Sequence, residues 1–197
     1  MTKPQEEFVD RGVGDFDRLE RLWAPYRMNY IVEKGTETSQ SGHRTNPFVE
    51  IPHLSDEEGL IVARGEYVYC VLNLFPYNSG HMMVVPYREE PNLEELTPAE
   101  SIELMAFTQA ALRVLKTASC PDACNVGFNL GRSAGGSVAE HLHLHVVPRW
   151  NGDSNFMTVI SGTKVLPQLL RETRRLFAQT WAELAAADET FPGVAHA

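Results

Sequence analysis

The sequence predicts an α+β domain built around an antiparallel β-sheet. Short β-rich runs follow one another through turn-forming stretches, and helical patterns separate the groups of strands. The chain of 197 residues is long enough for one domain with a hydrophobic core and short for two. We therefore expect a single domain at residues 16–187, a flexible segment at 1–15 and a flexible tail at 188–197.

Four stretches are expected to form the sheet. Residues 59–74 and 80–87 are β-rich runs joined by the turn-forming FPYNSG. Residues 123–130 and 140–150 predict two further strands, connected by the glycine-rich GRSAGGS. This arrangement favours strands paired by short turns.

Helical signals lie between and after these strands. Phe16, Leu19 and Leu22 have a helical period that ends before Pro25, and a polar loop is expected at about 33–47. A capping box at Thr97–Glu100 starts a helix that should run to about residue 118. Its predicted apolar face consists of Ile102, Met105, Ala106, Phe107, Ala110 and Val114. Residues 165–186 predict a closing amphipathic helix.

Net charge, apolar runs and cysteine content limit which partners and which cellular compartment the protein can have. A net charge of −9 argues against a general nucleic-acid binder, which would carry a basic surface. No run approaches the roughly 18 apolar residues of a membrane span, and the first thirty residues lack a secretory apolar segment. Cys70, Cys120 and Cys124 are odd in number and lack disulfide-framework spacing. These observations indicate a reducing compartment, and we expect a cytoplasmic protein.

The stretch EHLHLHVVPRW carries three alternating histidines. In a strand, His141, His143 and His145 share one face, while the aliphatic residues between them face the core. A metal site is one interpretation, although residues four apart on a strand are roughly 13 Å apart at the backbone. A structural histidine face is another. Nucleophilic catalysis is the third, because a neutral imidazole, with an unperturbed pKa of about 6.5, can attack phosphorus and form a covalent intermediate.

Donors for a phosphate group precede this strand. Asn129 offers an amide, Ser137 a hydroxyl, and Gly135 and Gly136 leave backbone N–H groups open to an anion. A plain β-turn is the alternative interpretation of these glycines. The stretch is not a P-loop, because no Gly-Lys-Ser/Thr follows it.

Two segments together resemble a known family. HLHLHVV resembles the signature of the histidine triad (HIT) superfamily, and NLFPYNSGHMMVVP is similar to the second segment of its dinucleoside-polyphosphate-cleaving branch. LWAPYRMNYI, NVGFNLGRSAGGS and VVPRWNGDSNF resemble the actinobacterial diadenosine tetraphosphate phosphorylases, also called ATP adenylyltransferases. The resemblance extends from about residue 10 to about residue 185. It implies the HIT fold, an antiparallel sheet with flanking helices.

The resemblance also implies roles for individual residues. His143 would be the nucleophile that takes AMP, His145 would bond the α-phosphate, and His141 would orient His143. Asn73 would meet the ribose hydroxyls, and His81 would support the site. Without the family, Asn73 is a turn residue and His81 an ordinary strand histidine. Asn129, Gly135, Gly136 and Ser137 would line the phosphate track, and Arg149 and Lys164 are extra cations or solvated side chains.

The implied reaction is a nucleotidyl transfer. Diadenosine tetraphosphate would donate AMP to His143, and phosphate would remove it, so that ADP and ATP form. A hydrolase that uses water, or a nucleotide-binding regulatory protein with little turnover, is the alternative. We expect no tightly bound cofactor, Mg²⁺ only with the substrate polyphosphate, and a homodimer or higher homo-oligomer.

The chain departs from the family pattern at two places. SVAEH has one extra position before the first triad histidine, so Ser137 aligns uncertainly and Glu140 has no counterpart in the simple members. Many bacterial relatives carry a CxxC zinc pair where this chain has TNPFVE. We therefore predict no structural zinc.

Overall fold

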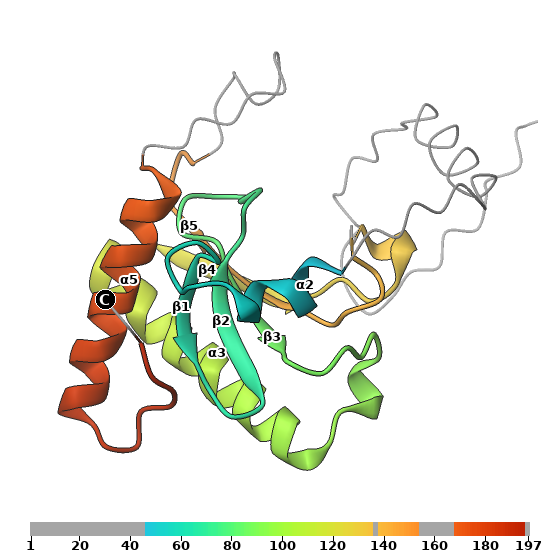
Figure 1. The fold of residues 1–197 in the computed structure, drawn as a ribbon. Helices are drawn as coiled ribbons and strands as arrows, with labels where there is room; N and C mark the ends of the chain where they lie inside the picture. Colours follow the sequence, from blue (N-terminus) through green and yellow to red (C-terminus); the bar gives the residue numbers. More distant parts are fainter. Residues whose placement is uncertain (1–45, 136–137, 154–167, 196–197) are drawn as a thin grey trace, which may run out of the picture. The chain divides into compact units, whose positions relative to one another are not determined.

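The computed structural model describes residues 46–135, 138–153 and 168–195. They form a five-stranded antiparallel sheet with the order β1-β2-β3-β5-β4 (Figure 1). The strands are β1 (Ile61–Arg64), β2 (Val68–Leu72), β3 (Met82–Pro86), β4 (Ala123–Phe128) and β5 (Leu144–Arg149). The α+β class is confirmed. The helix expected near residues 16–25, and the polar loop up to residue 45, lie outside the described residues.

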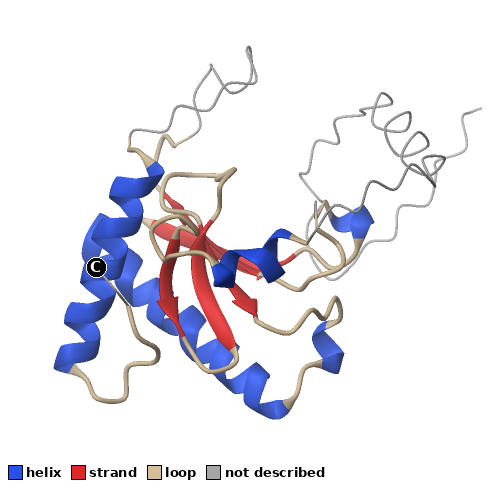
Figure 2. Cartoon of the chain, in the orientation of Figure 1, coloured by secondary structure: helices blue, strands red, loops and turns tan. Residues whose placement is uncertain are grey.

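Two long helices cover one face of the sheet (Figure 2). They are α3 (Pro98–Ser119) and α5 (Leu170–Ala187), and their contact includes the rings of Phe107 and Trp181, whose centroids are 5.3 Å apart. The core beneath them also takes in alternate residues of four strands, among them Cys70, Val84 and Val146. None of the helices in the described part of the chain is long and apolar enough to cross a membrane.

The capping box at the start of α3 is confirmed, but its predicted apolar face is only partly right. The Thr97 side chain accepts from the N–H of Glu100, and the Glu100 carboxylate accepts from the N–H of Thr97. Phe107, Ala110 and Val114 are buried, together with Leu104, Ala111 and Leu115. Ile102 and Met105 are exposed, at 71% and 51%. They lie beside the buried stripe because only one side of the helix meets the sheet.

The opposite face of the sheet carries a second, smaller core. The short helix α2 (Pro47–Glu50) places Phe48 there against side chains of β1, β2 and β3. This helix falls at the end of the expected polar loop and was not predicted. Asn46 caps it and Pro47 occupies its first turn, which is a recognisable local start signal. Three 3₁₀ turns complete the described structure: η1 (Ile51–His53), η2 (Leu93–Glu95) and η3 (Arg132–Ala134).

The tail after α5 is packed up to about residue 194, which corrects the expectation of a flexible tail from residue 188. Phe191 is buried against Trp181, whose indole N–H donates to the carbonyl of Pro192 at 2.9 Å. Val194 and Arg64 exchange two backbone hydrogen bonds of 2.8 Å, so the tail extends the sheet at β1. The helix itself begins at Leu170, later than the pattern suggested, and residues 165–167 lie outside the described residues.

Strand β5 begins at Leu144, not at residue 140 as predicted. The neighbouring strand β3 ends at Pro86, which has no N–H to donate, and the Pro86 carbonyl is bonded by the His141 imidazole. The ladder therefore stops, and His141 and His143 lie in the segment that leads into β5. Only His145 belongs to the strand.

Candidate active site

Four imidazoles gather on the α2 side of the sheet, at the junction of β3 and β5. His141, His143 and His145 come from the segment entering β5, and His81 precedes β3. All four are buried, with exposed fractions between 1% and 7%. The ring centroid of His145 lies 4.9 Å from that of His143 and 5.1 Å from that of His81. The structure thus brings together the three predicted catalytic histidines and the predicted support residue.

The orientation of His143 leaves one ring nitrogen available for reaction. Its Nδ1 atom lies 2.8 Å from the backbone carbonyl of His141. A carbonyl can only accept, so Nδ1 carries the proton and Nε2 keeps its lone pair. The ring of Phe48 packs against this imidazole with a centroid distance of 4.9 Å. No described residue bonds Nε2, so His143 is a neutral imidazole whose lone pair is free within the described structure, which is the form a nucleophile requires.

The tautomer of His145 is set by a chain of hydrogen bonds that starts at a backbone amide. The Tyr77 N–H donates to His81 Nδ1 at 3.0 Å, so the proton of neutral His81 is on Nε2. His81 Nε2 lies 2.9 Å from His145 Nδ1, to which it donates. The proton of His145 is therefore on Nε2. That N–H faces the side-chain amide of Asn129 at 3.2 Å, which meets it through its oxygen, since the two ends of an amide are interchangeable in shape.

The residue before His81 explains the Gly-His pair in the sequence. Gly80 has a φ of +78°, and a Cβ atom at this position would come within 2.9 Å of the Phe177 ring on α5. Any side chain would be strained by the backbone conformation and would collide with the core. The glycine therefore lets His81 turn toward His145.

Burial lowers the pKa of all four imidazoles. Loss of hydration is the largest cause in each case, and it brings the pKa of His145 to about 4 and that of His81 to about 3. Repulsion from neighbouring imidazoles acts in the same direction on both. The pKa values of His141 and His143 are also lowered, although hydrogen bonds to the carbonyls of Pro86 and His141 oppose the shift. All four rings are consequently neutral at pH 7.

The predicted substrate-binding residues have mixed outcomes. Asn73 caps its own turn by accepting from the Phe75 N–H at 2.9 Å, and its amide faces His81 Nδ1 at 3.4 Å. These contacts agree with the turn interpretation, and a ribose contact stays a prediction. Asn129 lies beside His145, as a phosphate donor should. Gly135 has a φ of +97° with open space at its Cβ position, whereas Gly136 and Ser137 lie outside the described residues.

Arg149, one of the two predicted cations, is engaged by a carboxylate. Arg149 pairs with Asp153 through two bonds of 2.6 and 3.0 Å, so it is not a free cation. Arg132, in the glycine-rich turn, pairs with Glu140 at 2.9 Å, and both side chains are largely exposed. Glu140, the extra residue of this chain, thus has a partner in the glycine-rich turn. Lys164 lies outside the described residues.

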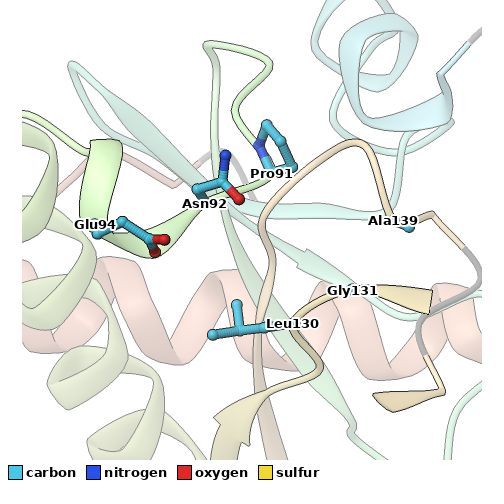
Figure 3. A pocket seen from close by; sticks show the side chains of 6 residues that line it. All are labelled: Pro91, Asn92, Glu94, Leu130, Gly131 and Ala139. Atoms are coloured by element: carbon cyan, nitrogen blue, oxygen red, sulfur yellow. The ribbon is translucent and has the colours of Figure 1, made fainter. Parts of the chain in front are cut away.

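A pocket of about 310 Å³ lies next to this turn (Figure 3). Its lining comes from the loop after β3, from the turn after β4 and from the segment before His141. It consists of Pro91, Asn92, Glu94, Leu130, Gly131 and Ala139. The histidines are not among these residues. The pocket therefore does not contain the His143 imidazole.

Three contributors to the site were missed in the sequence. Asn46 and Phe48 contact the triad from α2, and Tyr77 contributes both its N–H and a ring whose centroid is 5.4 Å from that of His145. The pair Asn46-Pro47 is a recognisable helix start in the sequence. The neighbouring residues, however, do not indicate which part of the protein that helix contacts. Asn46 and Phe48 therefore lie directly against His141 and His143.

The fold and the imidazole cluster define a class of protein, and comparison with known proteins identifies it. Residues 55–152 match the model of the HIT domain. The chain belongs to the HIT family.

Particular relatives are also close. A protein from Mycobacterium tuberculosis named AP-4-A phosphorylase is 65% identical over 175 residues, which cover 88% of this chain and 90% of the relative. The crystal structure of a zinc-bound histidine triad family protein from Mycobacterium smegmatis superposes with a TM-score of 0.55, at 28% identity, over 66% of this chain and 88% of that one. A hypothetical histidine triad nucleotide-binding protein from Sulfolobus tokodaii has the same fold, with a TM-score of 0.59 at 24% identity, over 74% of this chain and 97% of that one.

Proposed function

We propose that this protein is a diadenosine tetraphosphate phosphorylase. The observation that carries the proposal is His143, a buried neutral imidazole with a free Nε2 lone pair beside the Nε2–H of His145. The AP-4-A phosphorylase of M. tuberculosis, with which the chain shares 65% identity, supports the choice of substrate. The reaction converts diadenosine tetraphosphate and phosphate into ADP and ATP.

In the first step, His143 Nε2 attacks the α-phosphorus of the substrate. A bond forms between nitrogen and phosphorus, and the bond from the same phosphorus to the bridging oxygen breaks. ATP leaves with the electron pair of that bond. His145 donates its Nε2–H to an α-phosphate oxygen and stabilises the charge that develops there. The Asn129 oxygen accepts this N–H in the structure, so the phosphate oxygen takes its place when the substrate binds, and the Asn129 amide nitrogen is then a further donor for the phosphates.

In the second step, phosphate is the acceptor. One of its oxygens attacks the phosphorus of the adenylyl-histidine, the nitrogen–phosphorus bond breaks, and ADP leaves while His143 recovers its lone pair. Water is present at about 55 M, so phosphate succeeds only if the site positions it with an effective molarity well above that value. Space is open at the Cβ position of Gly135, although its own N–H donates to the Arg132 carbonyl at 3.2 Å. Mg²⁺ assists only by binding to the substrate polyphosphate, and no tightly bound cofactor is required.

Product analysis tests this proposal. Purified protein is incubated with diadenosine tetraphosphate, with and without phosphate, and the nucleotides are separated. We expect equal amounts of ADP and ATP with phosphate, and labelled phosphate in the β position of ADP. Arsenate should replace phosphate and yield AMP, through an unstable mixed anhydride. If AMP and ATP form at one rate regardless of phosphate, the protein is a hydrolase.

We further propose a cytoplasmic homodimer that binds no nucleic acid. The three cysteines are unpaired thiols, as a reducing compartment requires. Strand β4 lies at the edge of the described sheet and exposes Val126, and α3 exposes Ile102 and Met105. An open sheet edge with apolar side chains favours pairing with a second copy. Light scattering on the eluting protein should give twice the mass of one chain.

A further inference from the structure

We propose that Asn46 is a positioning residue of this active site, which holds His141 in one tautomer and thereby orients the nucleophile His143. The inference rests on the proposed function for its effect on catalysis. The part of the inference that concerns the tautomer of His141 does not depend on the substrate. Asn46 lies 95 positions from His141 in the chain, and its amide neither titrates nor acts as a nucleophile. Its contact with His141 is therefore seen only in the folded structure.

The orientation of the Asn46 amide is fixed on both sides. Its Oδ1 accepts from the Phe48 N–H at 3.0 Å, which caps α2. Its Nδ2 lies 3.0 Å from Glu89 Oε1 and 3.0 Å from His141 Nδ1. An N–H can only donate and a carboxylate can only accept, so the amide cannot be reversed. Nδ2 therefore presents a hydrogen to His141 Nδ1, which must accept it.

A second contact imposes the same tautomer on His141. Its Nε2 lies 2.8 Å from the Pro86 carbonyl and must donate to it. The ring is 1% exposed, so no water is available to substitute for either partner. A proton on Nδ1 would have to face the amide hydrogen that Asn46 directs at it. The two contacts together hold His141 neutral, with its proton on Nε2.

The fixed position of His141 then orients His143 through a main-chain hydrogen bond. The carbonyl of His141 accepts from His143 Nδ1 at 2.8 Å, which directs the lone pair of Nε2 outward. Phe48, two residues after Asn46, packs on both rings, with centroid distances of 5.6 Å to His141 and 4.9 Å to His143. One short segment thus fixes the hydrogen bond of His141 and the plane of His143.

Three variants separate this role from simple capping. Asn46→Ser keeps a capping side chain but is too short to reach His141. Asn46→Asp also keeps the cap, but directs an oxygen at His141 Nδ1 and at the Glu89 carboxylate. Glu89→Gln keeps an acceptor for the Asn46 amide and removes the charge. Ser55→Ala is the matched control, because Ser55 caps the turn before β1 through a 3.3 Å bond from the Glu58 N–H, outside the triad.

The first readout is the tautomer itself. Correlation spectra of histidine-labelled ¹⁵N protein without substrate should show His141 with its proton on Nε2 at pH 7. Asn46→Asp should convert His141 to the doubly protonated form, while Glu89→Gln and Ser55→Ala should leave it unchanged. A proton on Nδ1 in the unaltered protein, or an unchanged His141 in Asn46→Asp, would overturn the inference, whatever reaction the protein catalyses.

The second readout is adenylyl transfer from diadenosine tetraphosphate. Asn46→Ser should lower kcat about tenfold with little change in KM, the rate equivalent of one buried hydrogen bond. Asn46→Asp should lower kcat further at pH 7, and kcat should recover as the pH rises. The reason is that the raised pKa of His141 moves the acid limb of the pH–rate profile to higher pH. The titratable groups facing His141 are Glu89 and His143. An equal loss in Glu89→Gln would assign the effect to its charge and overturn the role of Asn46.

Discussion

The Nε2 atom of His81 lies 2.9 Å from the Nδ1 atom of His145, although the two residues are 64 positions apart. His81 is itself fixed by the Tyr77 N–H, so a backbone amide at the turn before β3 determines which nitrogen of His145 carries a proton. In the proposed reaction, His145 is thereby prepared to donate a hydrogen bond to the phosphate, while His143 beside it keeps the lone pair of a nucleophile. The two imidazoles carry their protons on different ring nitrogens because their hydrogen-bond partners differ.

Replacement of the nucleophile should abolish transfer. His143→Asn should lower kcat by about 10⁴-fold or more while the fold survives, because no other side chain can form the covalent intermediate. Single-turnover kinetics and mass spectrometry of the adenylyl-protein provide the measurement. His53→Asn, in an exposed turn, is the control and should retain full activity. Near-normal turnover in folded His143→Asn would exclude the covalent mechanism.

Replacement of His81 should disturb His145 without removing it. His81→Asn lacks the Nε2–H that reaches His145 Nδ1, so His145 can adopt the other tautomer and lose its outward N–H. We expect a decrease in kcat of about tenfold to a hundredfold, the cost of one misdirected buried hydrogen bond, with KM less affected. Steady-state kinetics should show this division. An unchanged kcat would mean that the tautomer of His145 has no influence on the rate.

Acid should destabilise the protein through the same histidines. The pKa values of His81 and His145 are lowered to about 3 and about 4 in the folded protein, from 6.5 in the unfolded chain. The unfolded state therefore binds more protons between these values. The stabilising contribution is complete above about pH 6.5 and is lost progressively as pH falls toward 4. Chemical denaturation at several pH values should show this slope, and it should be shallower in the double variant His81→Asn/His145→Asn.

Chelation should not alter stability. The cysteine pair expected of many relatives is absent, and Asn46 in the corresponding segment is occupied by hydrogen bonds to His141 and Glu89. Without a tetrahedral set of nitrogen and sulfur ligands, tight zinc binding is not expected. The thermal midpoint should be the same with and without EDTA. Stoichiometric zinc in the purified protein, measured by elemental analysis, would contradict this prediction.

The sequence determined the parts of this protein whose signals are local. The capping box at Thr97, the alternation around His145 and the turn before His81 are readable because a cap, a strand period and a turn each depend on a few neighbouring residues. The family signature added a predicted role for His143, since it is a contiguous motif. The apolar face of α3 was only partly readable, because Ile102 and Met105 have the correct chemistry but face away from the sheet.

The tertiary structure decided which nitrogen of each histidine is free. That question depends on partners distant in the chain: Pro86 and Asn46 for His141, and His81 for His145. The start of β5 at Leu144 was also decided by the tertiary structure, because it depends on the missing N–H of Pro86 in the neighbouring strand. A sequence motif specifies the residue types, whereas protonation and orientation follow from burial and from hydrogen-bond partners that only the folded chain brings together.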